Sequence, residues 1–293
     1  MGNKGILNWS IFILLAVIWG SSFIMMKEGL QYLTAFQLAS LRIVFSGIVL
    51  LPSAIIHFKR IPKNKLIIIF VSGFFGSLLP AYLFCVAELV IDGALAGSLN
   101  SLTPIFVILT GALFFKSKTA GKKIVGIFIA FAGSILLLIS KEHILENENL
   151  RYISFVILAT IFYGFNVNMV YKHLQNIGSL QIASIALTLN AIPALIVLYF
   201  TGYFNLNLSD PHILYSTGHA ALLGILATAI ASIIFYVLVK RAGAVFASMV
   251  TYGIPIIANI WGLIYGEEVG WKEFSCLLLI LFGVYLVNRK VAS

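Results

Sequence analysis

The chain has 293 residues, of which 61% are hydrophobic and 10% are charged, and its formal net charge is +9. A soluble domain is about 45–50% apolar and about 25% charged, so this composition excludes a water-soluble globular fold of this size. The basic residues are scattered through short segments and form no single face, which argues against a nucleic-acid partner.

Apolar runs long enough to cross a bilayer, which takes about 20 residues of helix, recur along the whole chain. The first follows Lys4 and lacks a small-residue cleavage motif, so we expect an uncleaved span rather than a signal peptide. The segment 201–219 is expected to be an outer loop. In chain order, the ten expected spans are residues 9–26, 35–57, 66–87, 94–115, 124–140, 152–171, 180–200, 220–239, 244–265 and 272–288.

Basic residues between these spans predict the orientation, because Lys and Arg are retained on the cytoplasmic side. If the N-terminus is cytoplasmic, 14 basic residues fall in cytoplasmic segments and 4 in outer ones. We therefore expect a multi-pass protein of the cell inner membrane with both termini in the cytoplasm. The 14 are Lys4, Lys59, Arg60, Lys63, Lys65, Lys116, Lys118, Lys122, Lys123, Lys172, Lys240, Arg241, Arg289 and Lys290; the 4 are Lys27, Lys141, Arg151 and Lys272.

A hydrophilic stretch from Lys141 to Arg151 divides the chain into two halves of five spans. We expect a first repeat at residues 1–145 and a second at 146–293. Because five is odd, the second half enters the membrane from the opposite side, as in many secondary transporters. The expected fold is an all-α polytopic membrane protein, with ten transmembrane helices in a 5+5 inverted repeat around a central cavity.

Matching residues at fixed offsets support this repeat. At an offset of 144 residues, Trp19-Gly20-x-Ser22 aligns with Tyr163-Gly164-x-Asn166. At an offset of 151 residues, Pro104 aligns with Pro255.

Several motifs resemble the EamA-like branch of the drug/metabolite transporter superfamily over nearly the whole chain. They are Trp-Gly-Ser-Ser-Phe at 19–23, Leu41-Arg42, Ala-Gly-Ser-Leu-Asn-Ser-Leu-Thr-Pro at 96–104, Gly266-Glu267 and Gly-Val-Tyr-Leu at 283–286. One departure is Ser117-Lys118, where the family often has Glu-Arg. The resemblance implies ten helices, a central cavity and transport of small organic metabolites, with amino acids first among them and export the commoner direction.

Polar residues inside apolar spans are the candidates for substrate contact. Trp19 and Ser22 are three residues apart and share a helix face, and Tyr163 and Asn166 repeat that geometry. We expect Asn166 and Asn168 to line a cavity, because their amides need partners in the low-dielectric interior. The alternative interpretation is helix packing, since small and hydroxyl residues join membrane helices.

Glycine and proline provide candidate hinges. Gly20 and Gly164 allow close approach of a neighbouring backbone or a substrate. Pro104 and Pro255 lie within spans, where proline removes a helix hydrogen bond and bends or loosens the helix.

Further candidate contacts lie near these prolines. Asn100 precedes Pro104 by four residues, and Asn259 follows Pro255 by four. Tyr82 and Tyr252 add aromatic surface with a polar tip, although packing would explain each tyrosine equally well.

Arg42 is the one clearly intramembrane charge in the sequence. An intramembrane cation is costly and needs a partner, for which Glu88 and Glu28 are candidates. The alternatives are a structural ion pair and an anchor for a substrate carboxylate. No Asp or Glu falls near the middle of a span. We therefore expect either a gradient-driven facilitator or exchanger, or a carrier that uses Glu88, near the outer mouth, as its only proton site.

Other protein classes fit the sequence less well. It contains no nucleophile–base motif, no His-Glu-x-x-His and no paired intramembrane carboxylates, so we expect no enzyme, metal site or cofactor. A channel would need rings of like groups along a pore. The sequence thus favours a secondary transporter that exports small metabolites such as amino acids by alternating access. The alternative is a broad-range efflux carrier for drug-like compounds, and homodimer formation stays open.

Overall fold

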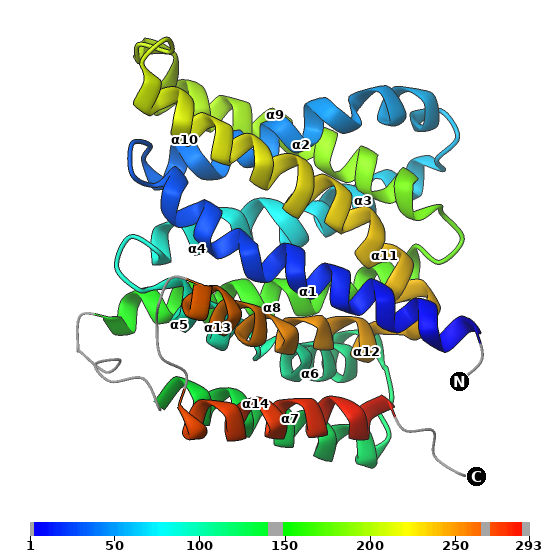
Figure 1. The fold of residues 1–293 in the computed structure, drawn as a ribbon. Helices are drawn as coiled ribbons and strands as arrows, with labels where there is room; N and C mark the ends of the chain where they lie inside the picture. The colour runs from blue at the N-terminus through cyan, green and yellow to red at the C-terminus, as the bar shows by residue number, and fades with distance from the viewer. Residues whose placement is uncertain (1–2, 140–148, 265–269, 289–293) are drawn as a thin grey trace.

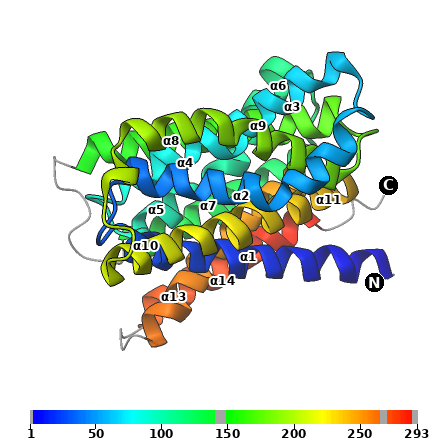
Figure 2. The ribbon, with the colours of Figure 1, turned by 90° about the horizontal axis from the view of Figure 1, so that it is seen from above.

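A computed structural model describes residues 3–139, 149–264 and 270–288, and every element in these ranges is helical. The long helices lie roughly side by side (Figures 1 and 2). The first helix begins and the last helix ends at the same end of this bundle (Figure 1). We call it the basic end, because it also carries Lys59, Arg60, Lys172, Lys240 and Arg241.

The helices of the first half are α1 (Asn3–Gly29), α2 (Ala35–Phe58), α3 (Lys63–Gly73), η1 (Phe74–Leu78), α4 (Leu79–Ala87), α5 (Gly93–Asn100), α6 (Thr103–Phe115) and α7 (Gly121–Ile139). Those of the second half are α8 (Asn149–His173), α9 (Ser179–Phe200), η2 (Tyr203–Asn205), α10 (Pro211–Leu222), η3 (Leu223–Ile230), α11 (Ala231–Ala242), α12 (Ala244–Ser248), η4 (Met249–Gly253), α13 (Ile254–Ile264) and α14 (Trp271–Asn288).

Seven helical stretches within the described ranges are long and apolar enough to cross a membrane: Gly5–Gly29, Ala35–Phe58, Lys63–Ala87, Leu95–Phe115, Leu150–His173, Ser179–Phe200 and Pro211–Ala242. Three shorter apolar helices, Lys123–Leu136, Ala244–Ile257 and Phe274–Val287, coincide with the other expected spans. The chain is therefore a polytopic helical membrane protein, while the count of ten crossings stays a prediction.

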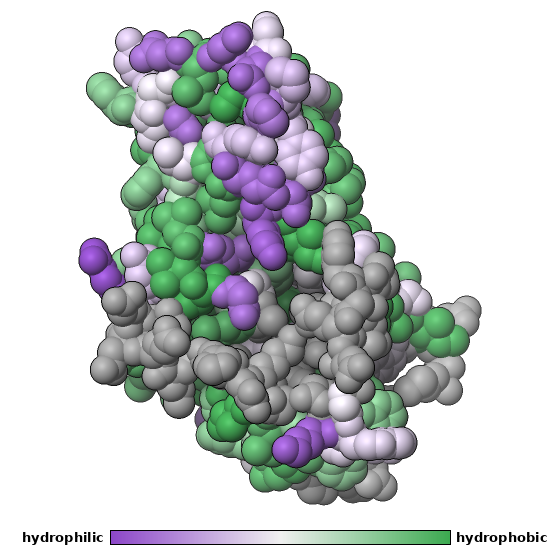
Figure 3. Space-filling model, turned by 60° about the vertical axis from the view of Figure 1, so that its left-hand side comes forward, coloured by the Kyte–Doolittle hydropathy of each residue, from purple (hydrophilic) through white to green (hydrophobic). Residues whose placement is uncertain are grey.

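The flanks of the bundle are apolar, as contact with lipid requires. Large side chains such as Leu113, Ile55 and Phe200 are 75%, 66% and 80% exposed. Figure 3, in which the end opposite the basic end comes forward, shows hydrophilic residues gathered on this end and hydrophobic residues along the sides.

Four of the spans are interrupted near their middle. The stretches η1 and η3 are π-helical segments, α5 stops at Asn100 before α6 begins at Thr103, and the 3-10 segment η4 separates α12 from α13. Within a membrane, irregular backbone is tolerated where it is buried in protein or lines a cavity. These four places are accordingly where a site is expected.

The structure corrects the expected outer loop at 201–219. A helix begins at Pro211, because the Asp210 side chain accepts a 2.8 Å hydrogen bond from the backbone N–H of His212 and proline fits the first turn. This helix continues through η3 to Ala242, so the span is longer than the expected 220–239.

The two prolines expected within helices stand instead at the start of new ones. Pro104 lies in the first turn of α6 and Pro255 in the first turn of α13. There the missing N–H costs little, because the first amides of a helix lack a helical partner anyway.

Helices α7 and α14 pack against each other at very short range. A Cβ atom added to Gly283 would lie 2.4 Å from the Ala130 backbone nitrogen, and one added to Gly126 would lie 2.9 Å from the Gly283 carbonyl oxygen. Small residues permit such backbone contact between membrane helices.

Candidate substrate-binding site

A cavity lies where the four interruptions meet, between helices of both halves of the chain. The volume that the centres of water molecules can occupy is about 80 Å³. Its described wall comes from α1, α2, η1, α4, α5, α6, α8, η3, α11, α12, η4 and α13, and none of that wall belongs to α7, α9 or α14. The polar lining residues are Ser22, Arg42, Ser77, Asn100, Thr103, Asn166, Thr228, Ser232, Ser248 and Thr251.

One wall is formed by Trp19 of α1 and the η3 segment of the second half. The Trp19 indole Nε1 donates a 2.9 Å hydrogen bond to the Ala227 carbonyl oxygen, and its ring meets Phe235 edge to face at 5.1 Å between centroids. The Ser22 hydroxyl donates to the Trp19 carbonyl at 2.7 Å. Trp19 and Ser22 both line the cavity, as their shared face predicts.

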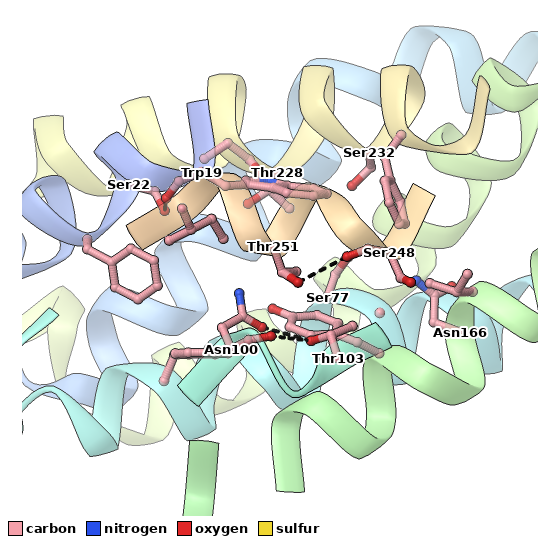
Figure 4. Close-up of a pocket in the computed structure, with 18 of the residues that line it drawn as sticks. Trp19, Ser22, Ser77, Asn100, Thr103, Asn166, Thr228, Ser232, Ser248 and Thr251 are labelled. Atoms are coloured by element: carbon pink, nitrogen blue, oxygen red, sulfur yellow. Dashed lines mark hydrogen bonds between the residues drawn. The ribbon is translucent and has the colours of Figure 1, made fainter. Parts of the chain in front are cut away.

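The two broken helices form two further parts of the wall. At the α5–α6 break, the Thr103 hydroxyl lies 2.8 Å from the Asn100 carbonyl oxygen and 3.0 Å from its Oδ1. In η4, the Thr251 hydroxyl donates to the Ser248 carbonyl oxygen at 3.0 Å. Figure 4 shows Asn100 and Thr103 on one side of the cavity, facing Thr251 and Ser248.

Helix α8 supplies Tyr163 and Asn166. The Tyr163 ring stacks on Phe84 at 6.2 Å between centroids. Asn166 is buried and packs directly on Gly76 of η1, where an added Cβ would lie 2.1 Å from its Nδ2 atom. Both residue pairs that the repeat aligns, Trp19–Ser22 and Tyr163–Asn166, therefore line the same cavity.

Arg42 of α2 carries the one charged side chain in the described wall of the cavity. Its Nε donates a 2.7 Å hydrogen bond to the Thr228 hydroxyl, which donates in turn to the Leu223 carbonyl oxygen at 3.0 Å. An arginine at the centre of a membrane span costs roughly 2.5–3.5 kcal/mol on insertion scales, so Arg42, seven residues into α2, needs polar or anionic partners.

Neither carboxylate considered as a partner forms an ion pair with Arg42. The Glu28 Oε2 atom accepts hydrogen bonds from Gln31 and Tyr215 instead. Glu88 directly follows the span that ends at Ala87, and its buried Oε1 atom has no hydrogen-bond partner among the described residues. Burial raises the pKa of the Glu88 carboxyl well above its ordinary value, against the opposing effect of the Arg42 cation.

Several predicted site residues lie elsewhere. Tyr252 is fully buried and donates a hydrogen bond to the Ile127 carbonyl oxygen at 3.0 Å, so it joins η4 to α7 instead of lining the cavity. The Tyr82 hydroxyl lies 2.7 Å from the Ser40 hydroxyl, outside the lining. Asn168 donates to the Val107 carbonyl oxygen and fixes α8 to α6. The side chain of Asn259 falls outside the described residues.

The two glycines of the repeated motif pack helices together. A Cβ on Gly20 would lie 2.6 Å from the Ile257 Cβ atom of α13, and one on Gly164 would lie 2.9 Å from the Phe106 carbonyl oxygen of α6. Of the two roles considered for these glycines, close approach of a neighbouring helix is the one this geometry favours.

Other lining residues were missed from the sequence, above all Thr228, Ser232, Ser248 and Thr251. Hydroxyl residues in a membrane span usually bond to their own helix backbone, so composition alone did not single them out. The four-residue spacing of Thr228 and Ser232, which places both on one face, was the available signal.

Comparisons with known proteins agree with this architecture. The model of the EamA-like transporter family matches residues 7–139 and 150–289. The chain is 27% identical over 289 residues to an "uncharacterized transporter" of Archaeoglobus fulgidus, covering 97% of this chain and 99% of the relative. It is 25% identical over 269 residues to a "probable amino-acid metabolite efflux pump" of Escherichia coli, covering 92% and 81%.

The fold has also been seen in a crystal structure. A protein of 14% identity matches with a TM-score of 0.70 over 96% of both chains. At this identity the likeness shows the fold alone.

Proposed function

Because the chain belongs to the EamA-like transporter family, within the drug/metabolite transporter superfamily, we propose that it exports amino acids or similar small metabolites by alternating access across the inner membrane. Membership makes it a membrane transporter of small molecules and not an enzyme.

The central cavity carries this proposal. Its wall combines Trp19, Asn100 and Thr103 from the first half with Thr228 and Thr251 from the second. A polar pocket at the junction of two bundles is the arrangement in which rocking of one bundle against the other exposes a site to each side in turn.

Reciprocal contacts favour an inverted repeat as the basis of this motion. Gly20 of the first half packs on α13 of the second, and Gly164 of the second half packs on α6 of the first. The α1 helix contacts η3, and α8 contacts η1. The two separate matches of the family model, one in each half, point the same way.

The size and chemistry of the cavity favour a small solute. One water needs roughly 10–15 Å³ of such volume, so a cavity of about 80 Å³ accommodates a molecule of amino-acid size. The rings of Trp19, Tyr163 and Phe235 suit an apolar side chain, and the hydroxyls and amides suit polar groups. The name of the Escherichia coli relative supports export of amino-acid metabolites.

Counterflow in proteoliposomes tests the proposal. Vesicles loaded with one amino acid of a panel are diluted into the same labelled amino acid, with a panel of lipophilic drugs tested in parallel. A carrier gives saturable uptake and a transient overshoot. Flux without saturation or counterflow would indicate a channel. Transport of the lipophilic drugs alone would show that drug-like compounds, and not amino acids, are the substrates.

A further inference from the structure

The charge balance of the cavity is unusual for a site that would bind an amino acid. Its described wall contains the Arg42 cation and no carboxylate. A bound zwitterion would find a counter-charge for its carboxylate and none for its ammonium group. The ammonium would meet neutral oxygens of Asn100 and Thr251 and the faces of aromatic rings, which compensate less for lost water than a carboxylate does.

The guanidinium of Arg42 is held in position by a hydrogen bond from one of its three nitrogens. Its Nε is held by Thr228, which is itself fixed to the Leu223 carbonyl oxygen of the same π-helical segment. Within the described part of the chain, no residue accepts a hydrogen bond from the terminal Nη atoms. An Nη pair presents two parallel N–H groups, a geometry that matches the two oxygens of a carboxylate.

Among the residues that the structure describes, no carboxylate occupies that edge. Glu28 is bonded to Tyr215 and Gln31, and Glu88 stands outside the cavity wall and forms no ion pair with Arg42. A doubly charged anion such as phosphate would leave one charge unpaired in the low-dielectric interior, which is costly. The geometry is therefore suited to a single negative charge.

We propose that the cavity recognises its substrate through one carboxylate bound to Arg42, and that the amino group contributes little. The substrate class is then small monocarboxylates with an apolar side chain, amino acids being one subset. This inference rests on the proposed transport function and specifies the chemistry of the same site.

A ligand series on the purified full-length protein separates the two charged groups. Alanine, valine, leucine and phenylalanine are each compared with the acid that lacks the amino group, with the primary amide of that acid, and with the amine that lacks the carboxylate. Binding is measured by thermal shift and by competition for uptake in proteoliposomes.

We expect each acid to bind within about threefold of its amino acid, and the amide and amine to bind at least about tenfold more weakly, as loss of a charge-assisted hydrogen-bond pair implies. Acid and amide have nearly the same shape, so their difference reports charge. An amide or amine that binds as tightly as the acid overturns the inference while leaving the transport function intact. Absence of any saturable binding or uptake overturns both.

Arg42→Gln should reduce the difference between acid and amide to within about threefold. Arg42→Lys keeps the charge without the paired N–H groups, so a smaller preference for the acid should remain. Arg60→Gln removes an exposed arginine at the basic end and should keep the full preference. If Arg42→Gln does not fold, the wild-type series and Arg42→Lys still decide the matter, since equal binding of acid and amide in either overturns the inference.

Discussion

The indole nitrogen of Trp19 donates a 2.9 Å hydrogen bond to the carbonyl oxygen of Ala227, which lies 208 residues later in the chain. The acceptor belongs to the π-helical segment η3, where backbone carbonyls lack the regular α-helical partners. The contact joins the first span to the irregular part of the eighth expected span and closes one wall of the cavity.

Trp19→Phe should lower the free energy of unfolding by about 1–2 kcal/mol, because it leaves a buried carbonyl without its donor. It should also reduce uptake, since the ring no longer fixes η3. Trp9→Phe is the matched control, because Trp9 packs on Phe12 and Phe246 and has no recorded hydrogen bond within the described residues. Thermal melting in detergent measures the difference, and equal melting of the two variants would contradict the role assigned to Trp19.

Gly76→Ala should abolish or strongly reduce transport while much of the protein still folds. The new methyl group would lie 2.1 Å from the Asn166 amide nitrogen, so this side chain must leave its position in the cavity. Gly218→Ala is the control, because no atom lies within 4 Å of the added methyl group, and alanine in a helix is worth about 0.5–1 kcal/mol over glycine. Substrate affinity of the two purified variants is the measurement. Unchanged affinity in Gly76→Ala would show that Asn166 takes no part in binding.

Gly283→Ala should reduce the amount of folded protein without changing the KM of what remains. The methyl group would meet the Ala130 backbone at 2.4 Å, and overpacking of this kind costs about 1–3 kcal/mol or more. Because neither α7 nor α14 contributes a described residue to the cavity, affinity should persist. Gly121→Ala, where nothing lies within 4 Å, controls for the change in composition. A raised KM would connect this helix pair to the substrate after all.

Glu88 makes stability depend on pH. Its folded-state pKa is raised above the ordinary value of 4.5, so the folded protein holds this proton more tightly than the unfolded chain. Stability should therefore fall as the pH rises from 4.5 through the raised pKa. Glu88→Gln should flatten this dependence, and Glu28→Gln should retain it. Melting temperatures measured between mildly acidic and mildly alkaline pH test the direction of this dependence. A steeper loss of stability with rising pH in Glu88→Gln than in the unchanged protein would contradict the prediction.

Cysteine labelling tests the inverted repeat. In a background with Cys85→Ala and Cys276→Ala, Arg60→Cys and Ser179→Cys should react with a membrane-impermeant reagent from the cytoplasm, and Ser209→Cys from outside. Arg60 lies between α2 and α3 of the first half, and Ser179 begins α9 of the second. Labelling of positions 60 and 179 from different sides would rule out the proposed arrangement.

The apolar spans and several cavity residues were predictable from the sequence. Trp19, Ser22, Tyr163 and Asn166 stand out because polar or amphipathic groups inside an apolar span must find partners. The helix start at Pro211 was also recoverable from Asp210, a capping residue directly before a first-turn proline, but the surrounding polar residues favoured a loop.

Other features had no local signal. Neither η1 nor η3 contains a residue that distinguishes a π-helical turn from an α-helical one, since their composition is that of any apolar span. Tyr252 and Tyr163 have the same side chain, yet one is buried against Ile127 and the other lines the cavity. Only the packing of neighbouring helices determines which face of a span is buried.

The π-helical turn within the span from Pro211 to Ala242 has an evolutionary consequence. Deleting one residue between Leu223 and Ile230 would let the backbone return to ordinary α-helical winding, and Ser232 and Phe235 would keep their faces, because the wider turn holds the extra residue. The helix would narrow beside Trp19, and the carbonyl that the indole now reaches would regain a partner within its own helix. Relatives that gain or lose a single codon here would thus change the wall beside the indole in one step, while every downstream side chain stays in register.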